Sequence, residues 1–138
     1  MNFSVVITAY DKHELTVLHV RECMNSSVVP DEIIVVNDCG TPDLKEKLQQ
    51  LEKKCKIIYA RINEDIPWNY TGARNLGVWL STGDYLMMED KDNIPSRDAY
   101  KLGLEYMEQH PELGRLVFGR RPKVYFSEIK DLPMEEWI

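Results

Sequence analysis

The sequence lacks paired cysteines, long apolar runs and an excess of basic residues, and each absence excludes a class of protein. Its three cysteines, Cys23, Cys39 and Cys55, are too few for a disulfide framework, and no two have the spacing of zinc ligands. No apolar run approaches the ~20 residues that a membrane-spanning helix needs, and the start MNFSVVITAY has no charged leader before a long apolar segment. We therefore expect a soluble, cytoplasmic protein without a membrane span.

The balance of charged residues indicates which partners the protein can bind. Against 17 lysines and arginines stand 23 aspartates and glutamates, which gives a formal net charge of -6. No basic stripe offsets this acidic surface, so the composition argues against a nucleic-acid partner. A chain of 138 residues, 43% of them hydrophobic, can bury one ordinary core, and we expect a single domain over residues 1–138.

The chain does contain a regular alternation of predicted strands and helices. Short apolar runs at residues 3–8, 32–37, 56–61 and 84–88 are typical of strands buried on both faces of a sheet, and two more strands are predicted at 115–119 and 123–126. Helical spacing of apolar residues fills the gaps between the first four, as in the seam of Ala73, Leu76, Gly77 and Leu80. A further helix follows Ser96. This order predicts an α/β fold with a mostly parallel central sheet flanked by helices.

Polar and aromatic residues gather where the predicted strands end. Thr8 and Tyr10 follow the first strand, Asp38 follows the second, and Arg74 lies at the start of the helix after the third. Because parallel sheets bind ligands at the carboxyl ends of their strands, we expect these side chains at one edge. An aromatic ring, a carboxylate and a guanidinium suit the base, the ribose or base N–H, and the phosphates of a nucleotide.

The acidic run EDKDN after the fourth strand is the sharpest signal. Asp90 and Asp92 are two positions apart, so in an extended chain both carboxylates point to the same side and Lys91 is turned away. Two carboxylates on one side repel unless a cation lies between them. Mg²⁺ or Mn²⁺ takes oxygen ligands and completes its shell with substrate phosphates, so the pattern predicts a metal site that binds a diphosphate.

Four segments together, SVVITAYDKHEL, EIIVVND, GARNLG and STGDYLMMEDKDN, resemble the inverting family 2 glycosyltransferases of GT-A fold. The resemblance covers about residues 3–96 and implies a single GT-A-like, Rossmann-type domain. It further implies transfer of a sugar from a nucleoside-diphosphate sugar, foremost a UDP-sugar, to a hydroxyl of a glycan or other acceptor. The transfer would depend on Mn²⁺ or Mg²⁺ and invert the anomeric configuration.

The resemblance also assigns roles to single residues. Thr8 and Tyr10 would border the base, Asp38 would accept its hydrogen bond, and Arg74 would line the nucleotide pocket. Asp90 and Asp92 would form the D-x-D motif that binds the metal and the diphosphate. Asp90 would also contact the nucleotide. Asp92 would be the firmer metal ligand and would act in catalysis through the metal.

The chain departs from the family pattern in two places. The usual DDGS after the second strand is NDCG here, which alters the expected ribose contacts. Family members also usually run further, and their later portion supplies the acceptor site and the carboxylate base. We therefore expect either a minimal or truncated enzyme or an acceptor site that comes from elsewhere. Glu135 and Glu136 are the only late paired carboxylates, and one of them is the predicted base.

Of two other interpretations, the first stays open and the second fails at two positions. A nucleotide-sugar binding module or pseudo-enzyme would keep the fold and lack the acceptor half. A signalling receiver domain has a similar length, but it needs an acidic pair after the first strand and an aspartate after the third, where this chain has TAYD and ARIN.

For the histidines and two of the tryptophans we expect a structural rather than a catalytic role. His13, His19 and His110 show no ligand spacing and are expected at the surface, while Trp68 and Trp79 are expected to pack against the fold. Trp68 could alternatively line the donor pocket.

Overall fold

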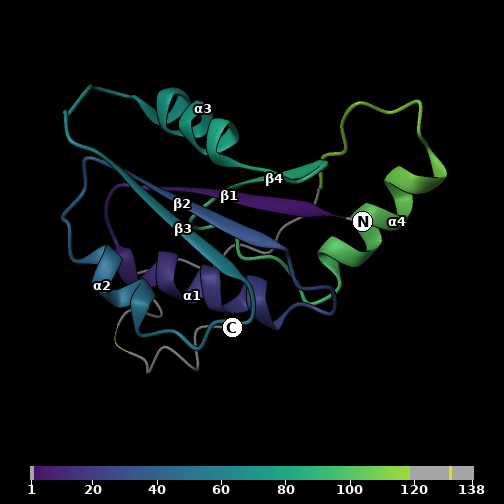
Figure 1. The fold of residues 1–138 in the computed structure, drawn as a ribbon, viewed down its shortest axis with the longest axis horizontal. Helices are drawn as coiled ribbons and strands as arrows, with labels where there is room; N and C mark the ends of the chain where they lie inside the picture. Colours follow the sequence, from purple (N-terminus) through teal and green to yellow (C-terminus); the bar gives the residue numbers. More distant parts are fainter. Residues whose placement is uncertain (1, 119–130, 132–138) are drawn as a thin grey trace. The chain divides into compact units, whose positions relative to one another are not determined.

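The structure, a computed structural model, describes residues 2–118 and 131 (Figure 1). The chain divides into two compact units, residues 1–102 and residues 103–138. The prediction of one domain over the whole chain stays a prediction. Within the described parts of the chain, no helix is long and apolar enough to cross a membrane.

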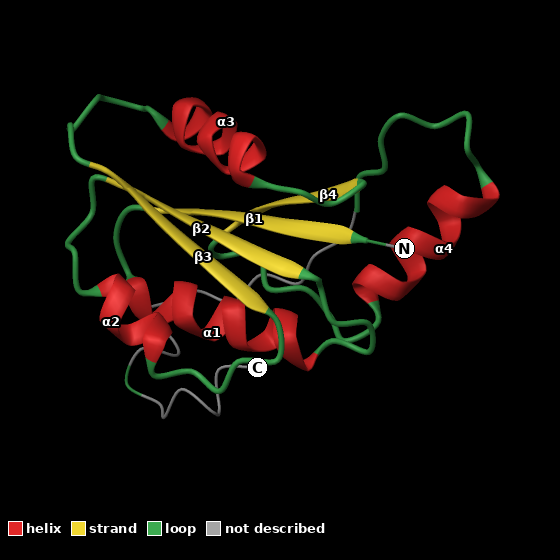
Figure 2. Ribbon diagram, in the orientation of Figure 1, coloured by secondary structure: helices red, strands yellow, loops and turns green. Residues whose placement is uncertain are grey.

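Strands and helices alternate along the first unit. The elements are β1 (Phe3–Ala9), α1 (His13–Asn25), β2 (Glu32–Asp38), α2 (Leu44–Gln49), β3 (Lys56–Ile62), α3 (Tyr70–Leu80), β4 (Tyr85–Asp90) and α4 (Ala99–Gln109), whose later part belongs to the second unit. The four strands form one sheet in the order β3-β2-β1-β4, and every neighbouring pair is parallel. Helices α1 and α2 cover one face of the sheet and α3 covers the other (Figure 2). The predicted α/β fold with a parallel sheet is confirmed.

The two central strands are the most deeply buried part of the fold. The side chains of residues 5–7 in β1 and 33–36 in β2 have no solvent exposure, because helices cover both faces. This double coverage explains why both strands are continuous apolar runs rather than alternating ones.

Helix α3 packs closely on the sheet through the predicted seam. Ala73 is buried against Val6 of β1 and the neighbouring β2 side chains, and Leu76 and Leu80 pack against the same cluster. A Cβ atom on Gly77 would lie 2.3 Å from Cγ1 of Val6, so only glycine allows this approach of helix to strand.

A buried carboxylate ties the amino-terminal edge of the sheet to the segment before β4. Glu32 accepts hydrogen bonds from Oγ of Ser4 at 2.8 Å and from the backbone N–H of Thr82 at 2.6 Å. Burial raises the pKa of Glu32, but these hydrogen bonds outweigh it and the pKa lies below its usual value.

The second unit contains the end of α4 and the described segment after it. A Cβ atom on Gly103 would lie 2.9 Å from the ring of Phe118, so this segment passes close to the helix. The prediction of a strand over residues 115–119 is wrong for 115–118, which are irregular. The strand predicted at 123–126 lies outside the described residues.

Candidate functional site

The carboxyl ends of β1, β2 and β4 surround a cavity at one edge of the sheet. Parallel pairing sets Thr8 beside Asp90, so the end of β1 and the acidic run are neighbours. The cavity has a volume of about 190 Å³. It is lined by Thr8, Ala9, Tyr10, Asp38, Tyr70, Asp90, Lys91 and Asp92. The structure therefore brings five of the predicted site residues together around one cavity.

Arg74, the sixth predicted residue, reaches the same site from α3. Its Nη2 lies 2.5 Å from Oδ1 of Asp90, and its guanidinium carbon lies 5.3 Å from the ring centroid of Tyr70, which lines the cavity. A guanidinium at the rim of the cavity can bind an anionic ligand that enters it.

Asp38 keeps one carboxylate oxygen available to a ligand. The side-chain amide of Asn69 donates a hydrogen bond to Oδ1 of Asp38 at 3.1 Å. The other oxygen, Oδ2, has no hydrogen-bond partner within the part of the chain that the structure describes. Asp38 can thus accept one more hydrogen bond inside the cavity, as the predicted contact with a base requires.

The neighbours of Asp38 show what the NDCG segment does. Asn37 is buried and donates to the backbone oxygen of Thr41 at 2.9 Å and to the hydroxyl of Tyr59 at 3.1 Å, so it braces the loop after β2. Cys39 has φ 59°, a left-handed conformation that favours glycine. The usual glycine of DDGS fits this backbone, and here a cysteine adopts it.

The geometry of the acidic run differs from the prediction. Strand β4 ends at Asp90, and the chain then turns, with the N–H of Asn93 donating to the backbone oxygen of Asp90 at 2.9 Å. We call residues 89–93 the acidic turn. The extended conformation expected for Asp90 to Asp92 is therefore wrong.

Lys91, expected to point away from the site, lines the cavity and forms an ion pair with Asp11 of the loop after β1. The hydrogen bond from Lys91 is the main reason that the pKa of Asp11 is lowered. The acidic turn is thus tied to the loop that carries Tyr10.

A second cavity of about 420 Å³ adjoins the first across Tyr10. Its lining comes from the loops after β1 and β2 and from the helices α1 and α2 that follow them, and the two loops touch at Gly40. A Cβ atom there would lie 1.9 Å from the backbone oxygen of Tyr10. The guanidinium of Arg61 donates to the backbone oxygen of Gly40 at 2.9 Å and holds the loop in place.

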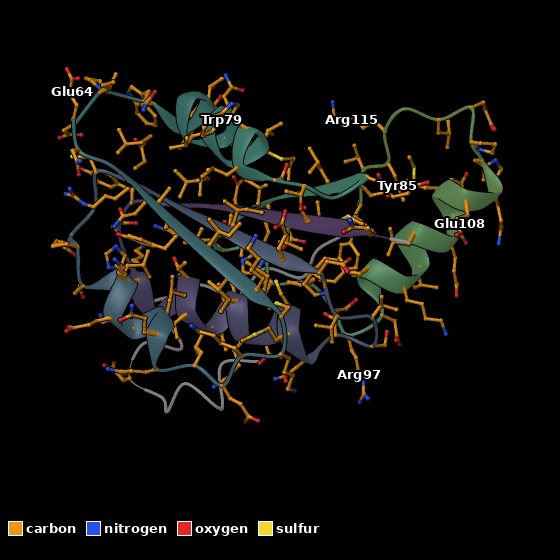
Figure 3. All side chains as sticks on the ribbon, in the orientation of Figure 1. Glu64, Trp79, Tyr85, Arg97, Glu108 and Arg115 are labelled. Carbon is orange, nitrogen blue, oxygen red and sulfur yellow. The ribbon has the colours of Figure 1, made fainter. Side chains whose placement is uncertain are left out.

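Several residues lie elsewhere than the sequence predicts. Trp68 and Trp79, expected to pack, are 91% and 79% exposed; Figure 3 labels Trp79 on the solvent side of α3. His13 and His19, expected at the surface, are buried. Tyr70 and Asn69 were not predicted as site residues, although their place in the loop after a strand was the available signal.

The predicted base remains untested, since Glu135 and Glu136 lie outside the described residues.

Comparison with known families gives one match that spans most of the chain. The model of the family described as glycosyl transferase family 2 matches residues 4–131. This range includes all six of the predicted residues at the cavity and covers both units in large part.

Curated relatives match the chain over part of their own length. An uncharacterised glycosyltransferase of Haemophilus influenzae is 29% identical over 96% of this chain and 49% of the relative. One of Rickettsia bellii is 30% identical over 78% of this chain and 15% of the relative. The amylovoran biosynthesis glycosyltransferase AmsB of Erwinia amylovora is 29% identical over 79% and 36%. The chain thus spans half or less of the length of these relatives.

Solved structures share the fold. S. aureus TarS superposes with a TM-score of 0.71 and 18% identity, over 80% of this chain and 33% of that chain. The complexes of TarS with UDP and with UDP-GlcNAc give TM-scores of 0.69 and 0.68. The likeness confirms the GT-A type of fold predicted for this chain.

Proposed function

Because the chain belongs to glycosyl transferase family 2, we propose that it transfers a sugar from a nucleoside-diphosphate sugar to an acceptor hydroxyl. The observation that carries this proposal is the single cavity that joins Tyr10 and Asp38 on one side to Asp90 and Asp92 on the other. One side suits a base and the other suits a diphosphate. The TarS complexes with UDP and UDP-GlcNAc support a uracil nucleotide as the donor's leaving group.

Tyr10 and Asp38 form the end of the cavity that would bind the nucleobase. Tyr10 is half exposed at the cavity, so a planar base can stack on its ring. The available oxygen of Asp38 would accept the N–H of the base. Arg74 lies on the opposite side, where its guanidinium would meet phosphate oxygens.

The diphosphate end fits a divalent cation. Asp90 and Asp92 offer carboxylate oxygens at one cavity, and Mg²⁺ or Mn²⁺ is commonly held by one or two carboxylates together with substrate phosphates. The cation would supply charge stabilisation for the leaving diphosphate. Arg74 pairs with Asp90 and offsets its charge. An incoming diphosphate offers this guanidinium a second anionic partner.

The acceptor hydroxyl must lose a proton as it attacks the anomeric carbon, and attack opposite the leaving diphosphate inverts the configuration. We propose that Glu135 or Glu136, the glutamates that the sequence predicts for this role, accepts this proton. A nucleotide-sugar binding module is the second candidate, because the cavity of Tyr10, Asp38, Asp90 and Asp92 accounts for binding of the donor alone.

Binding and turnover test these assignments separately. We expect UDP with Mn²⁺ to raise the melting temperature, since a ligand at 100 times its Kd adds about 2.7 kcal/mol of stability. Asp92→Asn should abolish the Mn²⁺-dependent part, and Asp38→Ala should weaken UDP binding while Mn²⁺ still strengthens it. Asp65→Asn, the same loss of charge at an exposed position outside the cavity lining, is the matched control.

Release of UDP from a panel of UDP-sugars distinguishes the two candidates. A transferase should release UDP with an acceptor, and slowly by hydrolysis without one. Binding without release across all donors and acceptors would favour the module. An Asp92→Asn variant with the wild-type response to Mn²⁺ would remove the metal assignment.

A further inference from the structure

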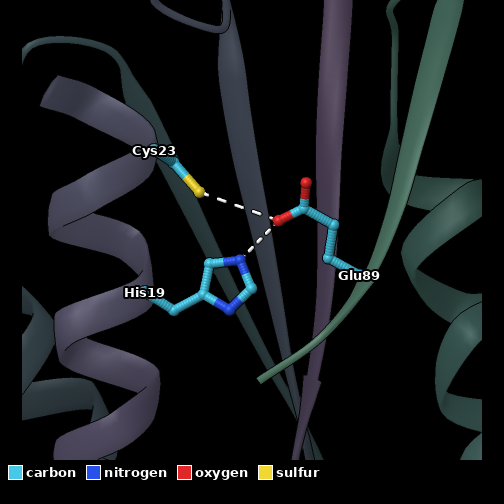
Figure 4. A group of neighbouring side chains, drawn as sticks. All are labelled: His19, Cys23 and Glu89. Atoms are coloured by element: carbon cyan, nitrogen blue, oxygen red, sulfur yellow. Dashed lines mark hydrogen bonds and ion pairs between the residues drawn. The ribbon is translucent and has the colours of Figure 1, made fainter. Parts of the chain in front are cut away.

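A buried polar cluster lies directly behind the acidic turn. His19 and Cys23, one helical turn apart on α1, point toward Glu89 at the end of β4 (Figure 4). Tyr100 completes the cluster from the start of α4. His19, Cys23 and Tyr100 are all buried, so the contacts between these groups are shielded from water.

His19 contacts the acidic turn at two points. Its Nδ1 lies 3.1 Å from the backbone oxygen of Lys91, and its Nε2 contacts Oε2 of Glu89. Because a carbonyl oxygen only accepts, Nδ1 carries a hydrogen and donates it. The ring therefore bridges the side chain of Glu89 and the backbone of Lys91.

Cys23 and Tyr100 complete this network as neutral groups. The sulfur of Cys23 lies 2.9 Å from the hydroxyl of Tyr100 and 3.9 Å from Oε2 of Glu89. Burial raises the pKa of the Cys23 thiol and of the Tyr100 hydroxyl well above their usual values. His19, Cys23 and Glu89 have the residue types of a metal site, but each already has a hydrogen-bond partner, and the network is complete without a cation.

Strand alternation explains why the acidic turn is held from both faces of the sheet. Successive side chains of a strand point to opposite faces, so Glu89 faces α1 and Asp90 faces α3. His19 of α1 holds Glu89, and Arg74 of α3 holds Asp90. Asp92, beyond the strand, is the acid of this turn for which the described part of the chain shows no ion pair.

We propose that His19 is a positioning residue of the site, which fixes the acidic turn so that Asp90 and Asp92 face the cavity. The effect of His19 on ligand binding rests on the proposed function, because His19 would hold the end of the cavity that binds the metal and the diphosphate. It does not touch the ligand itself. The base end, at Tyr10 and Asp38, should not depend on it.

Substitutions at His19 separate its two contacts. His19→Phe removes both. His19→Asn keeps a donor near the Nδ1 position, toward Lys91, and His19→Gln keeps a polar group near the Nε2 position, toward Glu89. Cys23→Ala is the matched control, since it perturbs the same cluster from the same helix without a contact to Lys91.

The first measurement is hydrogen exchange of the turn amides, above all the Asn93 N–H bonded to Asp90. We expect His19→Phe to speed their exchange about tenfold or more while the amides of β1 and β2 keep theirs. His19→Asn should show a smaller effect and Cys23→Ala none at the turn. Equal exchange in wild type and all three His19 variants, or a uniform increase across the sheet, would overturn the positioning role.

The second measurement is the Mn²⁺ dependence of UDP binding, compared with the binding of uridine, which has no diphosphate. We expect His19→Phe to lower the apparent Mn²⁺ affinity about tenfold, the lower end of the range for groups that support metal ligands, and to leave uridine binding unchanged. An equal loss for both ligands would contradict the proposal. If wild type binds no UDP, the proposed function fails, and the exchange experiment still decides whether His19 holds the turn.

Discussion

Gly40→Ala offers a test of the site that adds a single methyl group. Gly40 lies in the loop after β2, where its Cβ position is 1.9 Å from the backbone oxygen of Tyr10 and 2.5 Å from Oδ1 of Asn37. Its φ is not in the left-handed region, so an alanine is excluded by space and not by backbone conformation. Contacts at ordinary distance begin at 3.4 Å, which means that the two loops must separate by about 1.5 Å.

The loop after β1 is the side that must move. The Gly40 loop is held by the bond from Arg61 and by the two bonds of the buried Asn37. Overpacking of this kind typically costs about 1–3 kcal/mol. A displacement of Tyr10 also separates it from Asp38, and a misplacement of about 1 Å in a site can cost roughly a hundredfold. We expect Gly40→Ala to weaken UDP binding at least tenfold and to lower the melting temperature.

Titration calorimetry with UDP and Mn²⁺ measures the affinity, and thermal unfolding measures the stability. Gly114→Ala is the control, because a Cβ atom at Gly114 has no neighbour within 4 Å, and it should change neither quantity. Wild-type UDP affinity in a destabilised Gly40→Ala protein would show that the loops moved without affecting the ligand. That result would refute the assignment of Tyr10 and Asp38 to a common nucleotide site.

Two further predictions concern the fold that carries the site. Gly77→Ala should lower the free energy of unfolding by about 1–3 kcal/mol, and in the double variant with Val6→Ala the loss should be smaller than the sum of the single losses, because Val6→Ala makes room for the added methyl group. Glu32→Gln should cost about 1–3 kcal/mol at neutral pH in denaturant titrations. Since the folded pKa of Glu32 lies below its unfolded value of about 4.3, this contribution is present above that pH and disappears as the pH falls through the folded pKa. Strictly additive losses, or a Glu32→Gln deficit that does not shrink in acid, would contradict these explanations.

Much of the fold could be predicted because its signals are local. The four strands begin and end within about two residues of the predicted runs. The signal is clearest for β1 and β2, since a strand buried on both faces must be apolar throughout. The seam of α3 was confirmed because helical spacing alone decides which residues face the sheet. The same spacing places Trp79 off the seam, where it is exposed. The expectation that Trp79 packs against the fold was wrong because it contradicted this pattern.

Helix α1 shows where local signals fail. Asp11 and Glu14 have the spacing of a capping box, yet the helix begins at His13 after Lys12 in a left-handed conformation, with no side-chain cap. The carboxylate of Asp11 instead pairs with Lys91, 80 positions along the chain. A partner so distant leaves no trace in the spacing of nearby residues.

The acidic turn is where the sequence was both most informative and most incomplete. Its charges predicted mutual repulsion that a cation must offset, but two of its acids are offset by protein groups instead. Glu89 and Asp90 have protein partners, His19 and Arg74, because strand alternation directs one toward α1 and the other toward α3. Which helix covers which face depends on the topology, so neither pair was visible in the sequence. The two pairs together hold the acidic turn from both faces of the sheet.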